Sequence, residues 1–175
     1  MTTANKITIF RVVLIPVFLV LMYLRFPGHT YWAFGVFVLA SLSDFADGYI
    51  ARHYNQVSDF GKFMDPLADK LLVTACLMVF VGQGRMASWI AFIVVAREFA
   101  IMGLRSIAAA HGRVIAAGWS GKIKTSCTMV GLIAMMIFPS VQILDTVVCA
   151  VILVTTLYSG FEYFQKNWDV LMPGA

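Results

Sequence analysis

Four aspartates in one polar stretch are the residues with the clearest chemistry. The stretch reads DFADGYIARHYNQVSDFGKFMDPLADK; Asp44 and Asp47 are three residues apart, and Asp65 and Asp69 are four apart. On a helix both spacings place two side chains on one face, with their Cβ atoms about 5–6 Å apart. Two antiparallel helices that each offer two carboxylates predict a binuclear, all-oxygen metal site, which suits Mg²⁺ or Mn²⁺.

The surroundings of these aspartates favour a metal over a solvated surface. Apolar runs adjoin both pairs, Tyr31–Leu42 before the first and Leu71–Val81 after the second. A carboxylate beside hydrocarbon is costly unless something compensates its charge. Arg52 and Lys70 are the adjacent cations, too few for four carboxylates. The alternative, in which the pairs are helix caps or exposed residues, does not explain the apolar flanks.

The composition is that of a membrane protein. Of the 175 residues, 61% are hydrophobic and 13% are charged, and the mean hydropathy is +0.85. A soluble domain has about 45–50% apolar and 25% charged residues. The net charge of +4 does not indicate nucleic-acid binding, because the cations flank apolar runs. Cys76, Cys127 and Cys149 lie in apolar stretches and form neither a disulfide framework nor a metal spacing.

Six apolar stretches predict an all-α integral membrane protein with one domain over residues 1–175. Each is about 20 residues or longer, enough to span a bilayer as a helix. An amphipathic segment at Asn5–Arg11 opens the first stretch and is expected at the membrane interface. The stretches are Ile7–Phe26, Tyr31–Tyr54, Phe60–Val81, Ala87–Ala110, Trp119–Phe138 and Ile143–Phe164.

The distribution of cations predicts that both chain termini face the cytoplasm. With the N-terminus inside, ten Lys and Arg residues fall on the inner side and two, Arg25 and Arg85, on the outer side. Cytoplasmic loops carry the excess of positive charge in membrane proteins. The aspartate stretch is then also cytoplasmic.

The aspartates belong to a longer pattern, D-x2-D-G-x2-A-R-x8-G-x3-D-x3-D, which this chain matches at every position from Asp44 to Asp69. The pattern resembles the signature of the CDP-alcohol phosphotransferase family, membrane enzymes that pass a lipid phosphoryl group from a CDP-linked donor to an alcohol and release CMP. The resemblance implies two Mg²⁺ ions, with Mn²⁺ as an alternative, and a homodimer.

The resemblance also implies roles for single residues. Asp44, Asp47 and Asp65 look like metal ligands, and Asp69 looks like a metal ligand that also accepts the proton of the attacking hydroxyl. Contacts to the CDP donor are implied for Gly48, Ala51, Arg52 and Ser58. Upstream, Asn5, Thr8 and Arg11 read N-x2-T-x2-R. Asn5 and Thr8 are added to the donor site by resemblance; the alternative is that one of them caps the first helix.

Four cations predict a pocket for a phosphorylated acceptor. Arg97 lies inside the fourth stretch beside Glu98, and Arg105 is two turns further on; Lys122 and Lys124 begin the fifth stretch. Such side chains bind phosphate dianions. Two alternatives remain: Arg97 and Glu98 as a self-neutralising structural pair, and the lysines as anchors that reach the lipid headgroups.

The stretches REFAIMGLR and GWSGKIKT resemble the bacterial branch of the family that makes phosphatidylglycerophosphate. The expected reaction is phosphatidyl transfer from CDP-diacylglycerol to sn-glycerol 3-phosphate, in a bacterial plasma membrane with the active site facing the cytoplasm. One alternative is a different acceptor, such as inositol phosphate, serine or phosphatidylglycerol. The other alternative is a divalent-cation transporter. Transport needs access from both faces of the membrane, whereas all four carboxylates are expected towards one face.

Overall fold

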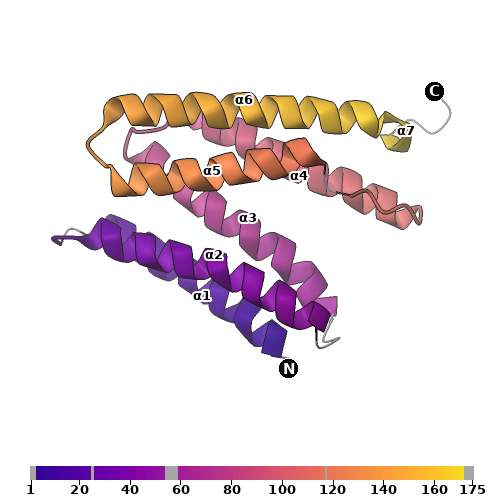
Figure 1. Cartoon of the computed structure of the whole chain (residues 1–175), viewed down its shortest axis with the longest axis horizontal. Helices are drawn as coiled ribbons and strands as arrows, with labels where there is room; N and C mark the ends of the chain where they lie inside the picture. The colour runs from indigo at the N-terminus through magenta and orange to yellow at the C-terminus, as the bar shows by residue number, and fades with distance from the viewer. Residues whose placement is uncertain (1–2, 25, 54–58, 117, 172–175) are drawn as a thin grey trace. The chain divides into compact units, whose positions relative to one another are not determined.

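The computed structural model describes the backbone of residues 3–24, 26–53, 59–116 and 118–171. Within these ranges it does not describe the side chains of residues 3–6, 44–53, 59–63, 65–66 and 171. All regular structure in these ranges is helical (Figure 1). The helices are α1 (Thr3–Tyr23), α2 (His29–His53), α3 (Asp59–Gly82), α4 (Ser88–Ala110), α5 (Trp119–Ile137), α6 (Gln142–Lys166) and α7 (Trp168–Leu171). The chain divides into two compact units, Met1–Gly82 (unit 1) and Gln83–Ala175 (unit 2).

In unit 1, α1 packs against both α2 and α3. A short turn joins α1 to α2, and a hydrogen bond between the His29 ring and the Leu21 carbonyl (3.1 Å) closes it. A Cβ built on Gly82 would lie 3.6 Å from the Tyr23 hydroxyl, so α1 and α3 end close together. Consequently α1 begins at the same end of unit 1 where α2 finishes and α3 starts (Figure 1).

Aromatic and small side chains form the core of unit 1. Phe18 of α1 and Phe37 of α2 are fully buried, with ring centroids 5.7 Å apart. Ala33 and Ala40 are also fully buried and let α2 approach α1 closely. Phe80 contributes the main aromatic side chain of α3 to the buried set. This packing holds α1 against α2 and α3, the two helices that carry the aspartate pattern.

In unit 2, α6 is the central helix and packs against both α4 and α5. Its buried residues recur at helical spacing, from Asp145 through Val148, Cys149 and Ile152 to Tyr163. The opposite face carries exposed Ile143, Val147, Val151, Val154 and Phe161. Apolar side chains on both faces are typical of a helix that contacts lipid on one side and protein on the other.

Glycine in a left-handed conformation ends α4. Gly112 has φ +71°, and the N–H groups of Gly112 and Arg113 donate to the carbonyls of Ala109 and Ala108. This is the Schellman arrangement, which satisfies carbonyls that the helix leaves without partners. It reverses the chain so that α5 can begin at Trp119, at the end of unit 2 where α4 finishes.

The predicted helices agree with the observed ones to within a few residues. Asn5–Arg11 lies in the first turns of a continuous α1. Thr8 and Arg11 are each 1% exposed, so these two side chains pack inside unit 1. An interfacial position for Asn5–Arg11 stays a prediction.

Length and composition support a bilayer span for one of the described helices. Within the described ranges, α6 alone is both long and apolar enough, and Ile7–Tyr23 forms a shorter apolar helix. By contrast, α4 carries Arg97, Glu98 and Arg105 within its length. The protein is therefore all-helical with one clear apolar candidate span, and six spans stay a prediction.

Candidate active site

The backbone carries the four aspartates of the sequence pattern to one end of unit 1. Asp44 and Asp47 lie in the second half of α2, and Asp65 and Asp69 in the first half of α3. Because α2 finishes and α3 starts at the end where α1 begins, the backbone places the helix segments that carry both pairs towards that end of unit 1 (Figure 1). The helical spacing within each pair, three and four residues, is the one that aligns side chains on one face.

Most side chains of the predicted donor and metal sites lie outside the described part of the structure. Asp69 is half-buried. The described side chains contain no group of three or more His, Cys, Asp or Glu residues that could hold a metal. The backbone is compatible with a metal, because carboxylate oxygens from two neighbouring helices are ligands that Mg²⁺ prefers. The structure does not describe Ser58, the exposure of Gly48, or the side chains of Asn5, Asp44, Asp47, Ala51, Arg52 and Asp65.

Thr8 and Arg11 belong to the same end of unit 1. Both are 1% exposed, and Arg11 is among the largest fully buried side chains of the described residues. A buried guanidinium is tolerated where anions or hydrogen-bond acceptors surround it. Sequence reasoning noted Arg11 in the N-x2-T-x2-R motif but left it out of the donor site. The feature that could have indicated a role for Arg11 is a cation in an apolar stretch, one helical turn from Thr8.

In unit 2 the structure brings two of the four predicted acceptor cations together. Arg97 of α4 and Lys124 of α5 donate to the same oxygen, Oε1 of Glu98, at 2.9 and 2.7 Å. The side chains of Arg97, Glu98 and Lys124 are 12%, 21% and 4% exposed. Lys124 therefore does not extend to a lipid headgroup. Two cations thus share one carboxylate oxygen.

The other two predicted cations have different partners. Arg105 Nε donates to the Tyr163 hydroxyl at 3.0 Å, and its guanidinium lies 5.9 Å from the centre of that ring. Lys122 is exposed, with its ammonium 5.0 Å from the centre of the Trp119 ring. Both stand at the end of unit 2 where α4 finishes and α5 begins. The structure thus brings Arg97 and Lys124 together through Glu98, whereas Arg105 and Lys122 have other partners at that end of unit 2.

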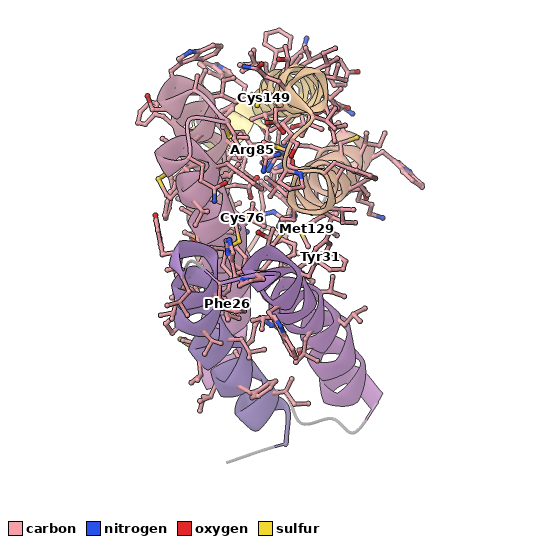
Figure 2. The ribbon with its side chains drawn as sticks, turned by 90° about the vertical axis from the view of Figure 1, so that its left-hand side faces the viewer. Phe26, Tyr31, Cys76, Arg85, Met129 and Cys149 are labelled. Atoms are coloured by element: carbon pink, nitrogen blue, oxygen red, sulfur yellow. The ribbon has the colours of Figure 1, made fainter. Side chains whose placement is uncertain are left out.

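A second polar cluster occupies the opposite end of unit 2. Arg85, in the turn before α4, forms a two-point ion pair with Asp145 of α6, at 2.8 Å (Nε–Oδ2) and 2.6 Å (Nη2–Oδ1). The Cys149 thiol contacts the Arg85 carbonyl at 3.8 Å, and Figure 2 shows the two residues near each other. The ion pair lines an open cavity of about 710 Å³. Sequence reasoning had counted Arg85 only as an outer cation.

Comparison with known proteins decides the family. Residues 1–158 match the CDP-alcohol phosphatidyltransferase family. The chain belongs to this family. The matched residues include the whole aspartate pattern and the Arg97–Glu98–Lys124 cluster, so the family match extends over parts of both units.

The chain is similar to several individual proteins over almost the whole length of both sequences. A protein of Bacillus subtilis (strain 168) is 38% identical, covering 95% of each chain. One of Yersinia enterocolitica is 36% identical over 95% of this chain and 96% of its own. One of Salmonella paratyphi A is 38% identical over 91% of each. All three are named CDP-diacylglycerol–glycerol-3-phosphate 3-phosphatidyltransferase.

Proposed function

We propose that the protein transfers the phosphatidyl group of CDP-diacylglycerol to sn-glycerol 3-phosphate, giving phosphatidylglycerophosphate and CMP. The observation that carries the proposal is the near full-length similarity, 36–38% identity, to relatives named for this reaction. The complete aspartate pattern, which the helices α2 and α3 bring to one end of unit 1, supports it from the residues.

The aspartates would hold the divalent ions. Asp44, Asp47, Asp65 and Asp69 supply only oxygen ligands, which favours two Mg²⁺ ions, with Mn²⁺ as the alternative. When bound, such ions neutralise charge on a pyrophosphate and on the transferring phosphoryl group. Their positive charge also lets four carboxylates coexist next to apolar helices.

Asp69 is proposed as the general base. Its carboxylate would accept the proton of the acceptor hydroxyl as that oxygen attacks phosphorus and the bond to CMP breaks. A carboxylate serves this role when it lies within hydrogen-bond reach of the hydroxyl. The donor nucleotide would contact Asn5, Thr8, Gly48, Ala51, Arg52 and Ser58. The buried Arg11, one helical turn from Thr8, adds positive charge at the same end of unit 1.

The acceptor phosphate would bind the cations of unit 2. Arg97 and Lys124 form the centre of this proposed site, because they are held together and mostly buried. Arg105 and Lys122, which stand at the same end of unit 2, would attract the dianion and contact its outer oxygens. A phosphorylated alcohol fits these cations better than serine does.

The proposed enzyme is one membrane domain over residues 1–175 with six spanning helices and both termini in the cytoplasm. The exposed apolar face of α6 supports contact with lipid, and the ten-to-two distribution of cations supports the orientation. The active site would then face the cytoplasm of a bacterial cell, at the plasma membrane. The homodimer rests on the resemblance to the family.

A purified-enzyme assay with several acceptors tests the proposal. The protein is incubated with CDP-diacylglycerol, Mg²⁺ and one alcohol at a time: sn-glycerol 3-phosphate, inositol phosphate, serine or phosphatidylglycerol. We expect CMP release with sn-glycerol 3-phosphate. Release with another acceptor alone would keep the family and overturn the substrate, and release with none would overturn the reaction.

A further inference from the structure

Arg97 is enclosed by all three long helices of unit 2. It extends from α4, and its guanidinium lies near Gly121 of α5 while its aliphatic stem lies near Gly160 of α6. Its Nε is buried and, among the described residues, has no hydrogen-bond partner. Leaving a buried donor without a partner is energetically costly. Such a guanidinium is suited to an anion that supplies the missing acceptor.

The α6 backbone at Gly160 sets the position of the Arg97 stem. A Cβ at Gly160 would lie 3.3 Å from Arg97 Cγ, closer than ordinary packing allows. At Gly121 a Cβ would lie 3.6 Å from Arg97 Nη2, an ordinary contact. A methyl group at Gly160 would therefore push the arginine by a few tenths of an ångström, whereas one at Gly121 would fit.

Glu98 sets the distance between the two buried cations. Its Oε1 accepts hydrogen bonds from Arg97 Nη1 and Lys124 Nζ together, so both cations stay around one oxygen. Lys124 is the more buried of the two, at 4% exposed. A buried ammonium requires a counter-charge in good geometry. Without the carboxylate, each cation would lose the hydrogen bond that places it beside the other.

We propose that Gly160 and Glu98 are positioning residues for the acceptor phosphate. Gly160 fixes the stem of Arg97, and Glu98 holds Arg97 and Lys124 at the spacing that an anionic acceptor recognises. The inference rests on the proposed function, which assigns Arg97 and Lys124 to the phosphate of the acceptor. It adds two residues that do not bind the phosphate themselves. Gly160 is uncharged, and Glu98 is negatively charged, as the phosphate is.

The first test is steady-state kinetics of the full-length Gly160→Ala enzyme. We expect the KM for sn-glycerol 3-phosphate to rise about tenfold, because small misplacements of a binding group cost up to about 10²-fold. The kcat and the KM for CDP-diacylglycerol should stay within about twofold. Glu98→Gln, which keeps an acceptor oxygen but removes the charge, should also raise the acceptor KM about tenfold.

Two glycine variants serve as matched controls. Gly131→Ala places its Cβ 2.7 Å from Val148 Cγ1, so it crowds the α5–α6 packing far along α5 from Arg97. Gly103→Ala meets nothing within 4 Å. We expect Gly131→Ala to lower the melting temperature and Gly103→Ala to have little effect, with the acceptor KM unchanged in both. A rise in acceptor KM in Gly131→Ala equal to that in Gly160→Ala would overturn the inference.

A double-mutant cycle separates positioning from general damage. If Gly160 and Glu98 act through Arg97, then Gly160→Ala and Glu98→Gln should add little to the acceptor KM of Arg97→Gln. Additive effects, or a lower acceptor KM in Glu98→Gln, would overturn the inference. If Gly160→Ala does not fold, the acceptor KM values of Glu98→Gln, alone and combined with Arg97→Gln, test the inference.

The Arg97→Gln enzyme distinguishes this inference from the proposed function. An acceptor KM unchanged in Arg97→Gln would overturn the acceptor site itself, and the inference with it. A raised acceptor KM in Arg97→Gln, with parent values in Gly160→Ala and Glu98→Gln, would overturn only the positioning role.

Discussion

Replacing Asp145 by alanine should destabilise unit 2 strongly. Asp145 holds Arg85 through two hydrogen bonds of 2.6 and 2.8 Å, and the two side chains are 9% and 14% exposed. Arg85 also donates a longer bond, 3.4 Å, to the Phe138 carbonyl. Asp145 lies in the first turn of α6, where the helix dipole favours a negative charge. The substitution therefore removes both of these charge-assisted hydrogen bonds from a mostly buried guanidinium.

The expected cost follows from this burial. Removing one partner of a buried ion pair costs about 3–5 kcal/mol. Because the pair borders an open cavity, we expect the lower end, about 3 kcal/mol. In a chain of this size each 1 kcal/mol lowers the melting temperature by roughly 2–4 °C, so the fall should be about 6–12 °C. Arg85→Met should behave similarly, because it leaves the carboxylate buried.

The chain offers a matched control in another Arg–Asp pair. Arg113 and Asp169 form a 2.5 Å ion pair whose side chains are 56% and 59% exposed. The hydrogen bond from Arg113 lowers the pKa of Asp169, so this pair contributes fully at neutral pH and loses its contribution as pH falls through the lowered pKa. Exposed pairs contribute little, and Asp169→Ala should melt close to the parent.

The assay is thermal unfolding of the full-length protein in detergent at neutral pH. A double variant, Arg85→Met with Asp145→Leu, should recover part of the lost stability, because an apolar pair carries no buried charge. Equal melting temperatures for Asp145→Ala and Asp169→Ala would refute the reasoning that burial sets the strength of the Arg85–Asp145 pair.

Three further predictions concern the proposed reaction and topology. Turnover and divalent-metal binding should be lost in Asp44→Asn, Asp47→Asn and Asp65→Asn, and full activity in excess chelator would exclude the metal. Asp69→Asn should keep much of the CDP-diacylglycerol affinity while its single-turnover rate falls roughly 10²–10⁴-fold; if it loses donor affinity as Asp44→Asn does, Asp69 is a ligand only. Cysteines introduced in the His53–Asp59 and Gly82–Met86 segments, in a protein without its native cysteines, should be labelled from opposite sides of sealed vesicles. Labelling of both segments from the same side would refute the topology.

The helices and the family could be predicted from the sequence because both depend on local patterns. Apolar stretches of about 20 residues predicted the helices, and the structure adds that Gly112, with a left-handed backbone, ends α4. The aspartate pattern uses spacings within two adjacent helices, so a single chain reveals it without knowledge of packing. The family match then confirmed the resemblance that this pattern had indicated.

The partners of the charged residues were decided only by the tertiary structure. Four cations looked equivalent in the sequence, yet Arg97 and Lys124 meet on Glu98 while Arg105 binds Tyr163. Arg85 and Asp145 are 60 residues apart, and nothing local pairs them. The reason is geometric: sequence spacing tells which residues share a face of one helix, but the rotation and crossing of neighbouring helices determine which faces meet.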